Sequence, residues 1–193
     1  LTKLKFNSNL ISVNISYNAG NFNRTTLNLF IMVIKLNKNI IYIDQFKLNC
    51  AVGKGGIKKK IEEGDKITPK GSFFIDKVYY RKDRIKKFRT RLNCKIIKKN
   101  MGWCNDPLHK KYNSLINTKL NIKHEKMYRK DNKYDLVIVV DYNLKKPVPF
   151  NGSAIFIHMT KNYKPTAGCV SLKKNDMLVL LKIINKKTKI KLN

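Results

Sequence analysis

The sequence predicts a mainly β domain that carries one helix near its C-terminus. Short apolar runs recur between turn-forming residues, which is the pattern of strands, and only one stretch near the end has helical character. Hydrophobic residues make up 42% of the 193 residues, so the chain can build a real core. This composition excludes a disordered or collagen-like protein.

The first half of the expected domain is rich in strand patterns. Residues 32–36, 40–43 and 46–52 form apolar runs that are separated by short polar turns. Glycine and proline then mark several turns, and 72–80 is the next predicted strand.

Residues 81–121 are basic and irregular, which predicts long loops folded over the core. Beyond them, the apolar runs 136–140 and 154–157 are bounded by turns and predict buried strands. We find no internal repeat.

The C-terminal part predicts a helix and a last strand. Asn175 is suited to cap a helix, Asp176 places an acid in its first turn, and the apolar run continues to Ile184. Residues 188–192 then have the pattern of a strand.

Residues 1–31 differ from the rest because they are rich in Asn, Ser and Thr and contain no acid. They offer neither the unbroken apolar centre of a signal peptide nor a run long enough to span a membrane. We expect residues 1–31 to be an extension outside the domain, which then occupies residues 32–193 with Met32 as its natural start.

The chain carries a net charge of +30, which predicts attraction to polyanions such as nucleic acid, anionic lipid or acidic wall polymer. The charge does not choose among these partners. Lys outnumbers Arg 36 to 6, and dedicated nucleic-acid proteins usually contain more Arg. Since Lys and Asn also have A/T-rich codons, the excess partly reflects genome composition, and a specific nucleic-acid partner is not favoured.

The four cysteines, Cys50, Cys94, Cys104 and Cys169, are widely spaced. They form no CxxC pair and no close Cys/His cluster, so we expect no metal site. A domain of this size can be stable through its core alone, and free thiols are therefore expected. No cofactor motif is found.

One Cys/His combination has the features of a catalytic site. His158 follows the predicted strand 154–157, so it should lie where the chain leaves the core, and Cys169 follows Gly168 in a tight turn. A thiol needs a base to become a thiolate near neutral pH, and backbone N–H groups of Gly168 and Cys169 can stabilise an oxyanion. The alternative from spacing alone is an inert buried cysteine with an unrelated histidine.

Several motifs resemble those of L,D-transpeptidase catalytic domains of the YkuD type. The likeness lies in residues 64–73, GDKITPKGSF, and in residues 155–172, which end in TAGCVSL. Residues 101–107, MGWCNDP, and the segments around Tyr112 and His124 resemble one bacterial branch of the family. The resemblance implies a β-sandwich of mixed sheets with a C-terminal helix and long loops over the cleft.

Residue roles also follow from the resemblance. Cys169 corresponds to the family's nucleophile, His158 to its general base and Gly168 to the glycine before the nucleophile. The cleft position suggests substrate contacts for four residues, although a sole Trp can equally anchor a loop: Thr166, Trp103, Met159 and Arg81.

The motif departs from the commonest version at two positions. Ala167 replaces a frequent histidine and Ser171 replaces a frequent arginine, so another cation would have to bind a substrate carboxylate. The candidates are Arg81, Arg84 and Arg129. A catalytically altered relative is one reading of these departures.

The resemblance implies thioester chemistry on peptidoglycan stem peptides, giving 3-3 crosslinks, in a monomeric enzyme of the periplasm or cell wall. Two alternatives remain open at this stage. Water in place of an amine acceptor would make the enzyme an L,D-carboxypeptidase. A non-catalytic basic module would instead bind nucleic acid or anionic wall polymer.

Overall fold

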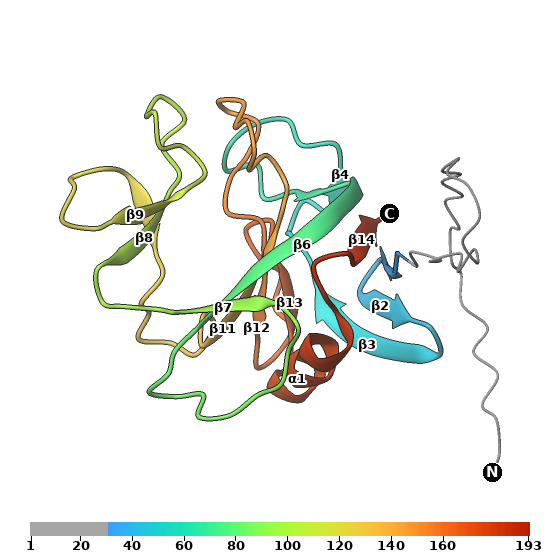
Figure 1. The fold of residues 1–193 in the computed structure, drawn as a ribbon. Helices are drawn as coiled ribbons and strands as arrows, with labels where there is room; N and C mark the ends of the chain where they lie inside the picture. Colours follow the sequence, from blue (N-terminus) through green and yellow to red (C-terminus); the bar gives the residue numbers. More distant parts are fainter. Residues whose placement is uncertain (1–30) are drawn as a thin grey trace, which may run out of the picture.

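The computed structural model describes residues 31–193, so the expected extension 1–31 lies, except for its last residue, outside the described residues. The order of elements is shown in Figure 1. One helix, α1 (Lys174–Ile183), accompanies fourteen strands among the described residues. The strands are β1 (Val33–Asn37), β2 (Ile40–Ile43), β3 (Phe46–Ala51), β4 (Ile57–Lys58), β5 (Thr68–Pro69), β6 (Gly71–Tyr80), β7 (Asn93–Ile96), β8 (Met101–Cys104), β9 (Leu115–Asn117), β10 (His124–Lys126), β11 (Leu136–Val140), β12 (Phe156–Met159), β13 (Val170–Leu172) and β14 (Lys189–Leu192).

The main sheet has nine strands in the order β11-β12-β13-β3-β2-β1-β14-β6-β7, with parallel and antiparallel neighbours. The long strand β6 closes it on itself, because its first half pairs with β14 and its second half with β11. Two layers of sheet therefore face each other across a shared core. This architecture confirms the expected mainly β fold with mixed sheets and one C-terminal helix.

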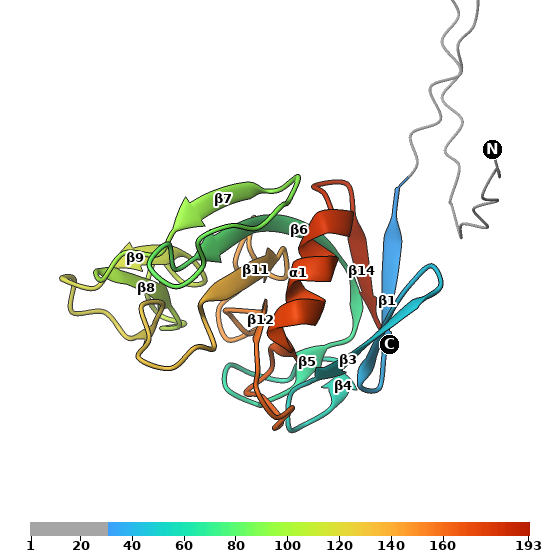
Figure 2. The same ribbon diagram turned by 90° about the horizontal axis from the view of Figure 1, so that it is seen from below.

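Strands β11, β12 and β13 are buried along their whole length and have two different faces. One face carries Ile138, Ile157 and Val170, which pack into the larger apolar cluster together with Leu180 of α1. Figure 2 shows α1 beside these strands. The opposite face carries Phe156, which belongs to a second, smaller cluster. Alternation along the strands thus separates a sealed core face from the face that bears the site.

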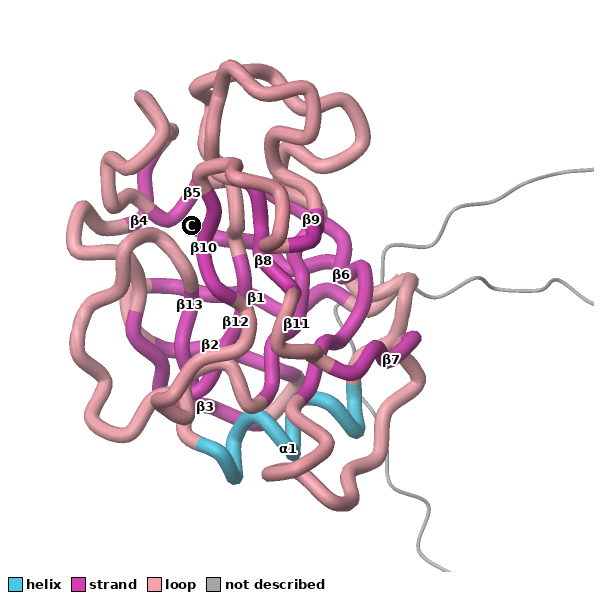
Figure 3. Tube along the Cα trace, turned by 90° about the vertical axis from the view of Figure 1, so that its left-hand side faces the viewer, coloured by secondary structure: helices cyan, strands magenta, loops and turns pink. Residues whose placement is uncertain are grey.

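The segment 81–121 contains more regular structure than its sequence suggested. Strand β7 extends the main sheet. Strands β8 and β9 form a small sheet with β10, and this small sheet lies beside the larger one in Figure 3. Strands β7, β8 and β9 have only three or four residues each, too few for a clear alternating pattern, so their pairing depends on tertiary contacts that a local pattern does not reveal.

The expected helix cap needs correction. The helix begins at Lys174 with Lys173 at its cap and no side-chain cap bond, so Asn175 lies in the first turn and does not cap. The chain enters α1 two residues after β13 ends, so the backbone is already helical at Asn175. Asp176 does lie in the first turn, and none of the described helices is long and apolar enough to cross a membrane.

Candidate active site

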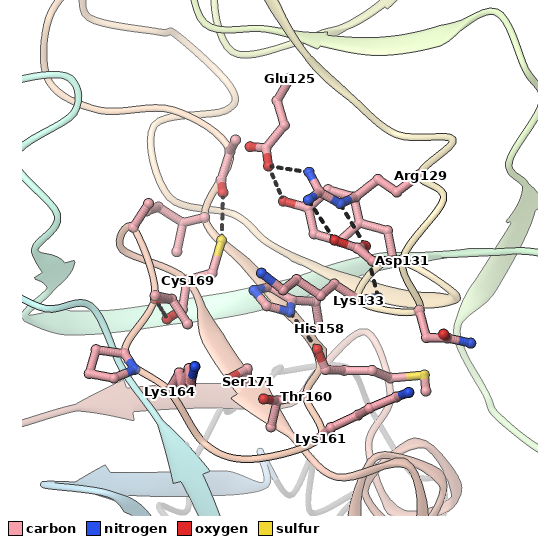
Figure 4. Close-up of a pocket in the computed structure, with 18 of the residues that line it drawn as sticks. Glu125, Arg129, Asp131, Lys133, His158, Thr160, Lys161, Lys164, Cys169 and Ser171 are labelled. Carbon is pink, nitrogen blue, oxygen red and sulfur yellow. Dashed lines mark hydrogen bonds and ion pairs between the residues drawn. The ribbon is translucent and has the colours of Figure 1, made fainter.

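A cavity of about 920 Å³ opens on the second face of β12 and β13. His158, Met159, Thr166, Cys169 and Ser171 line it, so five of the motif residues share one cavity. Figure 4 shows His158, Cys169 and Ser171 gathered there, with lysine side chains around them. The remaining lining residues come from loops at residues 60–64, 129–134 and 160–167, from the segment 153–155, and from Asn105, Glu125 and Lys174.

Strand register explains why these side chains meet. His158 on β12 lies opposite Ser171 on the parallel strand β13, and Cys169 precedes Ser171 by two positions. Residues two apart on a strand point to the same face. The sequence predicted that His158 follows the end of a strand. It lies inside the strand instead, because β12 runs to Met159.

The turn that presents Cys169 is fixed by neighbouring backbone. Gly168 has φ +134°, and a Cβ there would lie 3.0 Å from the carbonyl oxygen of Ile67, so only glycine fits without strain. The Thr68 hydroxyl donates to Gly168 O at 2.8 Å and accepts from the N–H of Gly53 at 2.8 Å. Thr68 belongs to the TP motif, so that motif supports the nucleophile turn directly.

Thr166 stabilises the same turn from the other side. Its hydroxyl donates to Cys169 O at 2.5 Å and accepts from the N–H of Gly168 at 3.1 Å. Because this N–H is already engaged, the backbone donor left for an oxyanion at this turn is that of Cys169. Thr166 lines the cavity, but its hydroxyl is occupied by the turn itself.

The Cys169 thiol is buried and protonated in this arrangement. Its Sγ donates to Ala154 O at 3.1 Å and accepts a 3.4 Å contact from the N–H of Phe156. Burial raises the pKa of the thiol to about 12, with the nearby Glu125 charge acting in the same direction. A proton acceptor is therefore required before the sulfur can act as a nucleophile.

His158 is buried as a neutral imidazole with a defined tautomer. Its Nδ1 lies 2.9 Å from Met159 O, and a carbonyl can only accept, so Nδ1 carries the proton and Nε2 has a free lone pair. The pKa of His158 is lowered to about 4, mainly by burial, with the charges of Lys133 and Arg129 acting in the same direction. The Tyr134 ring lies 5.3 Å away between ring centres.

In the described structure, Sγ of Cys169 bonds to Ala154 O and makes no hydrogen bond with His158. Figure 4 shows the two side chains as neighbours on one wall of the cavity. The resting pair is thus two neutral groups and not a preformed ion pair.

Two of the expected substrate residues lie outside the cavity lining. Trp103 on β8 is buried, packs edge-on against Phe156 with ring centres 5.0 Å apart, and donates to Asn113 at 2.9 Å. Arg81 is buried against the Tyr128 ring and pairs with Asp83 through two hydrogen bonds. Both residues support the surrounding structure.

The other arginines considered as carboxylate partners are also engaged. Arg129 lines the cavity but makes a two-bond pair with Asp131, and Arg84 pairs with Asp135. The lysines of the cavity wall differ, since among the described residues Lys161, Lys164 and Lys174 have no ion-pair partner. Sequence patterns do not point to these lysines, because an isolated Lys in a Lys-rich chain carries no recognisable signal.

The cavity also holds polar groups that sequence reasoning did not single out. The buried hydroxyls of Ser153 and Ser171 have no protein partner among residues 31–193. Lys60 is buried and bonds Asp65 and, at 3.2 Å, Ile67 O. Unsatisfied hydroxyls in a cavity wall are donors available to a bound molecule.

The cysteines are all unpaired, as expected, and all four belong to the described part of the chain. Within residues 31–193, no three His, Cys, Asp or Glu side chains gather in a way that could hold a metal ion.

A family model described as the L,D-transpeptidase catalytic domain (YkuD) matches residues 28–192. Solved structures with a similar fold include Bd1075 of Bdellovibrio bacteriovorus, at 14% identity and a TM-score of 0.44 over 84% of this chain and 48% of that one. Another is Pgp2 of Campylobacter jejuni, a helical cell shape determining protein, at 15% identity and a TM-score of 0.43 over 84% of this chain and 47% of that one. The chain spans about half the length of these two proteins, and no curated protein matches its sequence.

Proposed function

Because the chain belongs to the L,D-transpeptidase catalytic domain family, we propose that it transfers acyl groups between peptidoglycan stem peptides through a thioester on Cys169. The family match confirms the resemblance that the motifs indicated. The observation that carries the proposal is the shared cavity, in which a braced cysteine and a histidine of fixed tautomer lie on one sheet face.

The first proposed step forms the thioester. Sγ attacks the carbonyl carbon of the third stem residue while Nε2 of His158 takes the thiol proton. Since both groups start neutral, proton transfer accompanies the attack. The Cys169 N–H is the proposed donor to the oxyanion, because Thr166 holds that of Gly168.

The second proposed step releases the leaving group and resolves the thioester. The imidazolium returns its proton to the amine of the terminal D-alanine, and the carbon–nitrogen bond breaks. The amine of a second stem then attacks the thioester, an amide forms, and the thiol is regenerated with the proton that His158 relays. The product is a 3-3 crosslink.

The cavity chemistry supports an anionic peptide as the substrate. Lys161, Lys164 and Lys174 provide unpaired positive charge at its wall, and Ser171 provides a free hydroxyl where the family frequently has an arginine. We propose that these groups bind the stem carboxylates in place of Arg81, Arg84 or Arg129, whose guanidinium groups are engaged.

The family is typically associated with the cell wall, and we propose the periplasm or cell wall as the site of action. Residues 32–193 are the proposed catalytic domain, and residues 1–31 a segment outside it. The high positive charge suits a surface that gathers acidic wall material.

Tetrapeptide stems incubated with the purified chain test the proposal, with the products resolved by mass spectrometry. Crosslinked dimers that disappear in Cys169→Ala support it. Tripeptides without dimers identify an L,D-carboxypeptidase. No reaction and no covalent adduct on Cys169 would refute the enzyme and leave the basic binding module.

A further inference from the structure

Three loops at one end of the molecule carry the most exposed large apolar side chains of the described chain. Leu108 is 84% exposed, Ile61 80%, Val148 56% and Phe150 52%. The loops come from β4–β5, from β8–β9 and from the segment between β11 and β12. In Figure 1 they are the teal, yellow-green and orange loops at the top, and Figure 3 shows loops gathered at the same end.

The three loops, here called the loop platform (residues 58–67, 105–114 and 143–152), are joined in every pairwise combination. Tyr112 donates its hydroxyl hydrogen to Glu63, which joins the first two. Asn113 donates to Asn143 O at 2.7 Å, which joins the second and third. The Lys60 stem packs so closely on Gly152 that a Cβ there would lie 2.2 Å from Lys60 Cε.

The exposed apolar side chains of the platform, here called the tips, are Ile61, Leu108, Val148 and Phe150. Hydrogen bonds within the loops fix the backbone that carries them. Asn143 accepts from the N–H of Val148 at 2.8 Å and donates to Val148 O at 3.1 Å, which fixes that loop from within. Asp106 accepts from the N–H of Leu108 at 3.1 Å. Backbones fixed in this way present the tips to whatever meets this end of the molecule.

Each tip stands beside a pair of exposed lysines. The pairs are Lys58 and Lys59, Lys110 and Lys111, and Lys145 and Lys146, and none of these side chains forms an ion pair within residues 31–193. The acids of the platform are fewer. Glu62 is exposed, whereas Glu63, Asp65 and Asp106 already accept hydrogen bonds within it. The platform surface is therefore cationic around apolar points.

We propose that the loop platform docks on the surface of an anionic lipid bilayer. Apolar side chains beside lysines match the boundary between acyl chains and charged headgroups, where the former insert and the latter meet phosphates. A wall polymer or nucleic acid would satisfy the lysines but offers no apolar phase for four separate tips.

Docking would also fix the orientation of the catalytic cavity. Lys60, Glu63, Asn105 and Ser153 line that cavity and belong to the platform loops or directly follow one. The cavity mouth is therefore held near the bilayer when the platform binds. The docking proposal stands on exposure and charge alone, so it is independent of the proposed chemistry.

Co-sedimentation of the full chain with vesicles tests the docking. Vesicles of equal parts phosphatidylglycerol and phosphatidylcholine are compared with phosphatidylcholine alone. We expect binding to the anionic vesicles only, and a loss of about tenfold or more in the double variant Leu108→Ser, Phe150→Asn. Asn is chosen because Phe150 has φ +63°, which Asn tolerates. The matched control is Phe46→Ser, which removes an exposed ring from the start of β3 and should bind within twofold of the original chain.

A second measurement asks whether a tip enters the bilayer. Leu108→Trp should lose fluorescence with brominated lipids, whereas the original chain, whose only Trp is buried, should not. Unchanged binding of the double variant, or no quenching of Leu108→Trp, would overturn the proposal and leave charge alone as the attraction. Absence of binding to anionic vesicles overturns it as well. Activity on stem peptides in solution is a separate readout, so the two proposals fail separately.

Discussion

The molecule contains two Cys/His pairs on neighbouring strands, and only one borders a cavity. Cys169, directly before β13, and His158 on β12 line one cavity, while Cys104 and His124 are register partners on β8 and β10. Both cysteines are buried, and each histidine has Nδ1 close to a backbone carbonyl, Met159 O for His158 and Ile122 O at 2.6 Å for His124. Residue types and local bonds are thus nearly the same.

The difference lies in what surrounds each pair. Asn105 and Glu125, the sequence neighbours of Cys104 and His124, line the cavity, while Cys104 and His124 themselves do not. The His124 ring fills the space above Gly102, where a Cβ would lie 2.5 Å from Cδ2. A Cys/His pair becomes a candidate site only where the strand face is open and a braced turn presents the sulfur.

Removing the two thiols is the strongest test of this comparison. Cys169→Ala should lower turnover of tetrapeptide stems by at least about a thousandfold, because no other group replaces the nucleophile. Cys104→Ala should keep turnover within about a factor of two, with a small loss of stability from its buried site. Mass spectrometry of products and of acyl adducts measures both. Equal losses in the two variants would contradict the assignment.

Removing the two imidazoles is the next test. His158→Ala should lower the rate of thioester formation by about 10² to 10⁴ at neutral pH, since the thiol loses its proton acceptor. The loss should shrink as pH rises toward 10, because hydroxide then deprotonates the thiol without help. His124→Ala is the matched control and should retain the original rate. A His158→Ala enzyme with full activity at pH 7 would end the proposed role.

The burial of neutral His158 should make the free energy of unfolding sensitive to acid. His158 has a folded pKa of about 4 against an ordinary 6.5, so the unfolded chain binds the extra proton between these values. The free energy of unfolding is unaffected by this proton above pH 6.5. It falls as pH drops toward 4, and the loss at about pH 4 is roughly 3 kcal/mol. Urea unfolding from pH 7 to 4 measures the slope. His158→Gln should flatten the slope, and an unchanged slope in that variant would contradict a depressed pKa for His158.

The smallest expected effect concerns the brace of the nucleophile turn. Thr68→Val removes the hydroxyl that joins Gly53 to Gly168 O and leaves a buried donor and acceptor unmatched. We expect a loss of about 1–3 kcal/mol in unfolding free energy and a smaller kcat with nearly unchanged KM. Thr118→Val, directly after β9 in the three-stranded sheet, is the control and should leave kcat unchanged. Thr68→Ser, which keeps the hydroxyl, should restore both values, and failure of that rescue would disprove the brace.

Much of the fold could be predicted from sequence wherever one face or both faces of a strand are apolar. The runs 40–43 and 136–140 match β2 and β11, because burial leaves an unambiguous pattern. Strands β7 and β9 and the first turn of α1 were less visible. Their residues are polar or lie at element ends, and distant segments that pair with them decide their conformation.

The residues of the candidate site could be predicted from the sequence, but the protonation states of Cys169 and His158 could not. Local turn chemistry and the motif resemblance pointed to Cys169 and His158, and both line one cavity. Their neutral resting form depends on burial and on Ala154 O, which lies fifteen positions away in the chain. Trp103 and Arg81 illustrate the converse. Their residue types suit substrate contacts, but long-range packing places them outside the cavity lining.

Strand β14 has a consequence for how the protein assembles in time. It lies between β1 and β6 and comes after every other described strand in the chain, so this part of the sheet joins the two only when β14 is inserted. Before that moment β1 and β6 both expose unpaired edges, which are templates for association with other chains. A chain from which β14 has been removed should therefore associate more readily with other chains than the intact domain does.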